Sequence, residues 1–277
     1  MFRKIKVLYD NRGLVSDEFD KKKKFRIIVE NLIERYLLLR SDAIVVVSNA
    51  FKNYLSVKYQ NDNINKKINV IENSFSEKRF IFSEQLRLEQ RKKYKLEDKF
   101  IMVYSGPSVY WQRFDLVLTT FKLLKQIKKE AFLLVVSYDT NIKQAIVESG
   151  INMCDFSVYN IPASEVNNLL IMGDFGVIFR DDRIRSKVCA PIKLGEYLAS
   201  GLPILSMSEI GDTDSIIHDY NVGVIVKNVN EILIELKKII ELTNVPNIKK
   251  TCRKAAEKRL SLVSSADKYF SIYNNLK

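Results

Sequence analysis

One short stretch, residues 191–203, combines residue types that bind a phosphate with the boundaries of a single helix. Pro191 suits a first helical turn, where a missing N–H costs nothing, and Gly201 suits a left-handed C-terminal cap. Lys193 and Glu196 are three residues apart and share one face of this helix. A lysine at a helix N-terminus beyond a strand can bind phosphate, whereas a solvated Lys–Glu pair is the commoner outcome of this spacing. The residues alone leave both interpretations open.

Apolar runs on both sides place this helix in a parallel sheet. Residues 175–179 and 203–206 are short and apolar, as is typical of strands buried on both faces. Further strands of this kind are expected at 100–105, 131–137, 154–159 and 222–226. Helical segments alternate with these runs, and this alternation predicts an α/β fold with a doubly wound parallel sheet and right-handed connections.

The letters of residues 191–203, Pro-x-Lys-x-x-Glu-Tyr-Leu-Ala-x-Gly-Leu-Pro, resemble the donor-site motif of GT-B glycosyltransferases, specifically glycosyltransferase family 4 (group 1). The resemblance implies that Glu196 binds the ribose hydroxyls of a sugar nucleotide. It also implies that Lys193 lies at the same site, and we take both as candidate catalytic residues. The family often has a second glutamate eight residues earlier that contacts the transferred sugar, and here that position is Val188.

In a subset of the family, this segment has the sequence Leu-Arg-x-Asp followed by Ser/Ala-Pro-x-Lys. Residues 179–182 and 190–193 resemble that variant, and they make Arg180 a candidate for contact with the sugar or the phosphate.

Other candidate residues follow the predicted strands of the second half. The first strand-to-helix turn there contains Gly106 and Ser108, which are candidates for donor binding. A Trp-Gln-x-x-Asp stretch like that of the family subset contains Arg113, which we expect to contact the diphosphate in catalysis or to be a plain surface arginine. Tyr159 lies where a base-binding loop would lie, and it either stacks on the base or is a partly buried loop aromatic.

The resemblance predicts a GT-B architecture with one complete and one partial half. We expect a partial N-terminal, acceptor-side Rossmann-like domain at 1–75, a linker helix at 76–99, a C-terminal Rossmann-like donor-binding domain with a doubly wound parallel sheet at 100–258, and a tail helix at 259–277 that packs back toward the N-terminal domain.

The N-terminal part offers few strands for a complete domain. Residues 10–13, Asp-Asn-Arg-Gly, resemble an Asp-x-Arg-Gly stretch that several strand–helix units precede in the family, although they also fit a structural turn with an Arg–Asp pair. A helix is expected over 25–40, where Ile28, Leu32 and Tyr36 recur at helical spacing. At most three strands precede residue 75, so we expect a truncated acceptor side or a second chain that completes it.

The charge of the chain is positive and uneven. The net charge is +12, and residues 1–100 hold 23 lysines and arginines against 14 acidic residues, an excess of nine. Such an excess fits an anionic membrane surface, nucleic acid or a phosphate-rich substrate. The sequence shows neither a DNA-recognition helix nor the basic residues interleaved with aromatics that bind single-stranded nucleic acid. No nucleic-acid partner is therefore expected.

The three cysteines lack disulfide or ligand spacing, which fits a reducing compartment. We therefore predict a cytoplasmic protein, with peripheral contact at the inner face of the cell membrane.

The resemblance implies a retaining, hexosyltransferase-type enzyme that moves a sugar from a nucleotide-diphosphate sugar to a glycan or lipid-linked acceptor of a bacterial surface polysaccharide (capsule, O-antigen or exopolysaccharide). Such transfer requires stabilisation of the leaving diphosphate and exclusion of water. No cofactor or metal is expected, since the Asp-x-Asp letters at 212–214 begin a helix. The alternative is a truncated, non-catalytic or partner-dependent subunit that binds the nucleotide sugar, which Val188 and the partial N-terminal domain favour.

Overall fold

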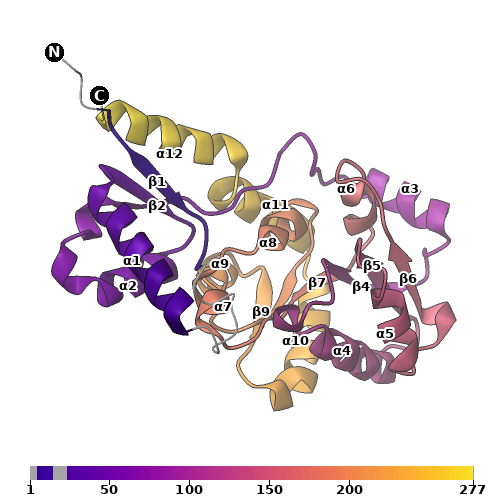
Figure 1. Cartoon of the computed structure of the whole chain (residues 1–277). Helices are drawn as coiled ribbons and strands as arrows, with labels where there is room; N and C mark the ends of the chain where they lie inside the picture. Colours follow the sequence, from indigo (N-terminus) through magenta and orange to yellow (C-terminus); the bar gives the residue numbers. More distant parts are fainter. Residues whose placement is uncertain (1–4, 15–23, 277) are drawn as a thin grey trace.

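The computed structural model describes residues 5–14 and 24–276, which form two parallel sheets (Figure 1). The N-terminal sheet has the order β1-β2-β3, and its strands are β1 (Leu8–Asn11), β2 (Ala43–Val46) and β3 (Ile68–Val70). Its helices are α1 (Lys24–Arg40) and α2 (Asn49–Lys58), followed by the 3-10 turns η1 (Gln60–Asp62) and η2 (Asn65–Lys67). We call this part the N-terminal unit.

The two faces of the N-terminal sheet pack on different helices. Ile44 and Val46 of β2 pack on Phe51 of α2, whereas the alternate residue Val45 packs on Ile272 of the last helix, α12 (Leu262–Asn275). Side chains alternate between the faces of a strand, and the apolar run of β2 is therefore buried on both sides.

The remaining strands form one larger sheet in the C-terminal unit. Their order is β6-β5-β4-β7-β8-β9. The strands are β4 (Phe100–Ser105), β5 (Ala131–Val136), β6 (Phe156–Tyr159), β7 (Phe175–Ile178), β8 (Ile204–Met207) and β9 (Gly223–Val226). The order reverses at the parallel pair β4–β7, and ligands of open α/β sheets bind in the crevice at the carboxyl ends of the strands at such a reversal.

Helices cover both faces of this sheet, as Figure 1 shows. One face packs on α4 (Phe114–Ile127), α5 (Ile142–Glu148) and α10 (Ile232–Thr243), and the other on α6 (Val166–Leu170), α8 (Ile192–Ala199), α9 (Thr213–Tyr220) and α11 (Ile248–Arg259). The remaining short elements are α7 (Ile184–Val188), η3 (Tyr110–Gln112), η4 (Met153–Asp155) and η5 (Val229–Glu231).

A buried ion cluster attaches the linker helix α3 (Glu84–Tyr94) to the amino end of β7. Arg87 and Arg91 donate to the two carboxylate oxygens of Asp174, at 2.7 and 2.9 Å. The same carboxylate accepts from the backbone N–H of Ile101 at the start of β4. Removal of one partner of a buried ion pair costs about 3–5 kcal/mol, and the cluster therefore fixes α3 on the C-terminal unit.

Polar contacts join the two units near the carboxyl ends of the larger sheet. The Asp212 carboxylate accepts from the backbone N–H groups of Asn49 and Ala50, at 2.7 and 3.1 Å, and so caps α2 from across the interface. Ser48 donates to the Val188 carbonyl at 2.7 Å. Among the described residues, no helix has both the length and the hydropathy to cross a membrane.

Candidate donor-binding site

The side chain of Lys193 lies at the reversal point of the larger sheet. Helix α8 begins directly after Pro191, and the hydroxyl of Tyr197 on this helix accepts from the backbone N–H of Ser105 at 2.6 Å. This bond holds α8 over the carboxyl end of β4. Gly106 follows with φ of +131°, and a Cβ atom there would lie 3.3 Å from Nζ of Lys193. Only glycine allows both this backbone conformation and the close approach.

Lys193 is a buried cation that has few partners. Its Nζ donates to Oε1 of Gln112 at 2.9 Å and lies 4.6 Å from the centre of the Tyr104 ring. Burial and, to a smaller extent, the positive charge of Arg180 together lower the pKa of Lys193 to about 7. Nε of Arg180 is buried and has no hydrogen-bond partner within the described ranges. Two neighbouring cations with this little compensation are chemically suited to bind an anion.

Glu196 lies one helical turn beyond Lys193 on α8 and is half-buried. Burial raises the pKa of the Glu196 carboxyl, and the nearby charges of Arg79 and Lys193 act in the opposite direction. No hydrogen bond to its carboxylate is found in the described part of the chain, which leaves both oxygens available as acceptors. A ligand with a pair of hydroxyl groups can satisfy them.

In the structure, Arg113 and Ser108 are both engaged with partners other than Lys193. Arg113 adopts a left-handed backbone with φ of 44°, and its guanidinium binds the Asp115 carboxylate at 2.8 Å. Ser108 directs both its backbone N–H and its hydroxyl to Asp139, so these donors are already engaged. Contacts of these two residues with the sugar-nucleotide donor remain predictions. Each residue would have to give up its present partner to contact the donor.

Tyr159 is half-buried and packs against other side chains of the C-terminal unit. Its ring contacts the Tyr94 ring edge to face, with 5.4 Å between the ring centres. It also packs against the apolar core between the sheet and its helices. Stacking of this ring on a nucleotide base stays a prediction.

Val188 has a structural role at the position where the family often has the second glutamate. Its side chain is 2% exposed and packs in the core of the N-terminal unit, while its carbonyl accepts from Ser48. The buried environment of this position does not suit a carboxylate that reaches toward a sugar.

Gln112 and Tyr104 surround the Lys193 ammonium, and both were missed at the sequence level. Gln112 stands inside the Trp-Gln-x-x-Asp stretch that drew attention to Arg113. Because a left-handed residue follows η3, the arginine and the glutamine point to different neighbours. The stretch itself was the available signal, and only its backbone geometry shows which residue reaches the site.

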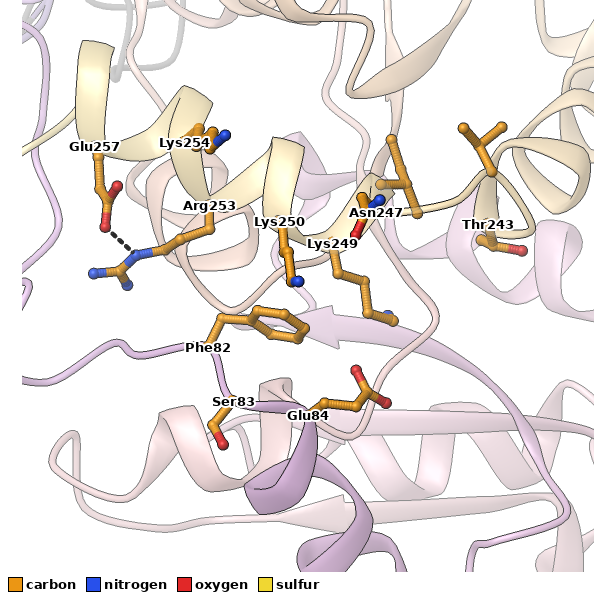
Figure 2. Close-up of a pocket in the computed structure, with 12 residues that line it drawn as sticks. Phe82, Ser83, Glu84, Thr243, Asn247, Lys249, Lys250, Arg253, Lys254 and Glu257 are labelled. Carbon is orange, nitrogen blue, oxygen red and sulfur yellow. Dashed lines mark hydrogen bonds and ion pairs between the residues drawn. The ribbon is translucent and has the colours of Figure 1, made fainter.

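A separate cavity of about 780 Å³ lies between α11 and the segment before α3 (Figure 2). Figure 2 shows Lys250 above the ring of Phe82, with Ser83 and Glu84 on the other side. Lys249, in its wall, donates to the carbonyl of Gly173 just before β7. The cavity therefore lies at the amino ends of the strands, at the opposite end of the sheet from Lys193.

Solved structures with the same architecture are glycosyltransferases. The chain is similar to sucrose-phosphate synthase from Thermosynechococcus elongatus, with a TM-score of 0.73 and 14% identity over 97% of this chain and 67% of that chain. It is similar to Anabaena HepE in complex with UDP, with a TM-score of 0.72 and 16% identity over 98% and 72% of the two chains. For WaaG, a glycosyltransferase involved in lipopolysaccharide biosynthesis, the TM-score is 0.67 with 14% identity over 91% and 74%. At these identities the likeness shows the fold, and it confirms the predicted α/β GT-B class.

The fold and the motif at α8 define a glycosyltransferase of the GT-B type. No curated protein matches the sequence. A family model, "Glucosyltransferase 3-like, C-terminal domain", matches residues 118–259, just over half of the chain. The protein belongs to this glucosyltransferase 3-like family, and the resemblance to GT-B glycosyltransferases is confirmed.

Proposed function

We propose that the protein binds a uridine-diphosphate sugar and transfers the sugar, with retention of its anomeric configuration, to a glycan or lipid-linked acceptor of a bacterial surface polysaccharide. The observation that carries the proposal is the pair of neighbouring cations, buried Lys193 and half-buried Arg180, at the reversal point of the sheet. The complex of HepE with UDP supports the choice of nucleotide, and the role of WaaG in lipopolysaccharide biosynthesis supports the acceptor class.

The proposed chemistry follows from the charge that develops during transfer. The bond between the anomeric carbon and the diphosphate oxygen breaks, and the electron pair stays on the diphosphate. An acceptor hydroxyl oxygen bonds to the anomeric carbon on the same face, and its proton passes to the leaving diphosphate. Lys193 and Arg180 stabilise this growing negative charge in a site where burial strengthens electrostatic interactions. Gly106 leaves room for the phosphate beside the ammonium, and Glu196 accepts hydrogen bonds from the ribose hydroxyls.

Calorimetric titration with UDP, GDP and ADP tests the donor site. We expect UDP to bind most tightly, and Glu196→Ala and Lys193→Gln each to weaken binding at least about tenfold, since each removes a charged hydrogen-bonding group worth about 1.5–3 kcal/mol. Lys250→Gln, which changes a lysine of the cavity at the opposite end of the sheet, is the matched control and should bind like the wild type. The proposal fails if none of the three nucleotides binds.

A second candidate function is nucleotide-sugar binding without transfer, or transfer only with a partner chain. Val188 in place of the family's glutamate and the three strands of the described N-terminal sheet favour it. Measurement of UDP released from UDP-sugars, with and without glycan acceptors, separates the two functions once UDP binding is established. Binding without release under any of these conditions favours the second function.

We infer contact with the inner face of an anionic membrane from the nine excess positive charges of residues 1–100, and a cytoplasmic location from the three cysteines without disulfide spacing.

A further inference from the structure

The cavity between α11 and the segment before α3 has no part in the proposed transfer reaction. Its volume of about 780 Å³ lies within the range of about 300–1,000 Å³ that is common for sites of small molecules. Lys193 and Glu196 are not among the residues that line it, and it lies at the opposite end of the sheet from them. The cavity can therefore hold a ligand of its own.

Packing and hydrogen bonds hold the walls of this cavity in place. On the wall formed by α11, Arg253 pairs with Glu257 at 2.7 Å and donates to the carbonyl of Ala199, the last residue of α8, at 3.2 Å. On the facing wall, the ring of Phe82 packs on Gly201, where a Cβ atom would lie 2.6 Å from the ring. The cavity is therefore already formed without a ligand, as is usual for small-molecule sites.

One side of the cavity is positively charged. Lys249, Lys250 and Lys254 come from the first two turns of α11. Lys250 and Lys254 are exposed, and neither forms an ion pair with another residue that the structure describes. Burial and, to a smaller extent, the positive charge of Arg87 lower the pKa of Lys249 to about 8. A phosphate group beside these three ammonium groups would supply the negative charge that the wall lacks.

The opposite side of the cavity carries groups that bind hydroxyls. Ser83 and Glu84 lie there, across the ring of Phe82 from Lys250 (Figure 2). One carboxylate oxygen of Glu84 accepts from Arg87 at 3.3 Å, and no partner of its other oxygen is found in the described part of the chain. The Ser83 hydroxyl caps α3 as an acceptor, so its hydrogen remains available for donation. The half-buried Phe82 ring between the two sides offers an apolar surface.

We propose that this cavity is a binding site for a phosphorylated sugar. The phosphate lies against the three lysines of α11, the C–H groups of the sugar ring cover Phe82, and the sugar hydroxyls reach Ser83 and Glu84. Inorganic phosphate lacks the hydroxyl groups for the second side, and an uncharged sugar lacks the anion for the first. This site is separate from the donor site and does not depend on it.

Protection of single lysines from acetylation tests the proposal, with glucose 1-phosphate as the probe. The full chain is acetylated with and without the probe, and each lysine is followed by mass spectrometry. At ten times its dissociation constant, the probe should slow acetylation of Lys250 and Lys254 about tenfold, because the free site decreases by that factor. Lys92 and Lys93, exposed at the other end of α3, should react at the same rate in both samples.

Calorimetry with glucose 1-phosphate provides a second measurement. The double variant Lys250→Gln/Lys254→Gln should bind at least about tenfold more weakly, since it removes two charged donors. The double variant Lys92→Gln/Lys93→Gln removes the same charge from the far end of α3 and should bind like the wild type. Lys193→Gln should also bind like the wild type, which separates the cavity from the donor site.

Several results would overturn the proposal. They are no protection of Lys250 and Lys254, equal protection by inorganic phosphate or by glucose, and equal losses of affinity in the two double variants. Loss of binding in Lys193→Gln alone would assign the probe to the donor site, and stronger protection by UDP would assign the cavity to a nucleotide. Because none of these measurements uses turnover or requires UDP to bind near Lys193, the cavity and the donor site can fail independently.

Discussion

Lys193 occupies an environment that an anionic ligand would relieve. In the free protein, burial and Arg180 both oppose its charge, and Gln112 supplies the one hydrogen bond to its ammonium found within the described ranges. A diphosphate beside it would restore the favourable electrostatics that burial removes. If the proposed nucleotide binds here, its affinity should depend on the protonation of this single side chain.

This linkage predicts that UDP affinity falls as pH rises above 7. At pH 6.5 most of the Lys193 ammonium is already charged, because its pKa is lowered only to about 7. At pH 8.5 most of the Lys193 side chain is neutral. Binding of UDP to the charged form then requires that Lys193 take up a proton from solution. The affinity should decrease by up to about tenfold per pH unit over this range. Calorimetry at pH 8.5 in two buffers of different ionisation enthalpy should show proton uptake, which Lys193→Gln should abolish; uptake that persists in this variant would assign it to another group.

Gln112 is expected to position the Lys193 ammonium. Gln112→Leu removes the acceptor at 2.9 Å and leaves a buried ammonium without it, which costs about 1–3 kcal/mol. We expect UDP affinity to fall about five- to tenfold and the pH at which affinity declines to shift downward. Gln126→Leu changes an exposed glutamine of α4 and serves as the control. An affinity loss with an unshifted pH profile would mean that Gln112 acts on the fold of the site rather than on the lysine.

At the scale of elements, the connection from α7 to α8 sets the position of Lys193. Gly211 follows β8 with φ of +53°, and a Cβ atom there would lie 1.8 Å from the carbonyl oxygen of Cys189, two residues before Pro191. Its backbone N–H also donates to the Lys187 carbonyl at 3.0 Å. No side chain fits at Gly211 unless this connection moves.

Gly211→Ala should therefore affect both stability and nucleotide binding. We expect the free energy of unfolding to fall by more than about 2 kcal/mol, since strain and a backbone clash act together, and UDP affinity to fall with it. Gly13→Ala, at a glycine with open space around it, should change neither by a measurable amount. Denaturant unfolding and UDP titration of both variants check this, and unchanged affinity in a destabilised Gly211→Ala would show that α8 keeps its place independently of the connection.

The sequence predicts where helices and strands occur better than it predicts what packs against each of their faces. Strands such as β5 and β8 were predicted correctly because a run buried on both faces is continuously apolar and has one environment. The helix predicted over 25–40 is present as α1, yet its apolar stripe points outward, since periodicity gives a face but not what covers it. The same limit explains why the motif at α8 identified Lys193 but not Gln112. Gln112 lies in a different strand-to-helix turn, and only the folded structure shows that it contacts Lys193.

At the scale of the whole molecule, α12 joins the two units. It follows α11 of the C-terminal unit and lies along the N-terminal sheet (Figure 1), where Ile272 packs on Val45. Tyr269 of the same helix donates to the Asp10 carboxylate at 2.9 Å, and Arg12 pairs with Asp10 at 2.8 Å. The Asp-x-Arg-Gly stretch of the sequence thus contributes a structural Arg–Asp pair that α12 completes.

Because α12 covers one face of a three-stranded sheet, the N-terminal unit should depend on it more than the C-terminal unit does. Ile272→Ala removes a side chain that is 8% exposed and should cost about 2 kcal/mol, the lower end for such truncations at a partly covered site. Phe270→Ala, on the exposed side of the same helix, should cost less than about 0.5 kcal/mol.

The single tryptophan allows the two units to be followed separately. Trp111 lies in η3 of the C-terminal unit, so its fluorescence reports that unit, whereas far-ultraviolet circular dichroism reports both. In Ile272→Ala we expect the dichroism transition to begin at lower denaturant while the Trp111 transition and UDP affinity stay at wild-type values. An equal shift of both transitions would instead show that α12 and the contacts of Asp212 make the two units unfold as one, because a purely local loss cannot move a probe in the other unit.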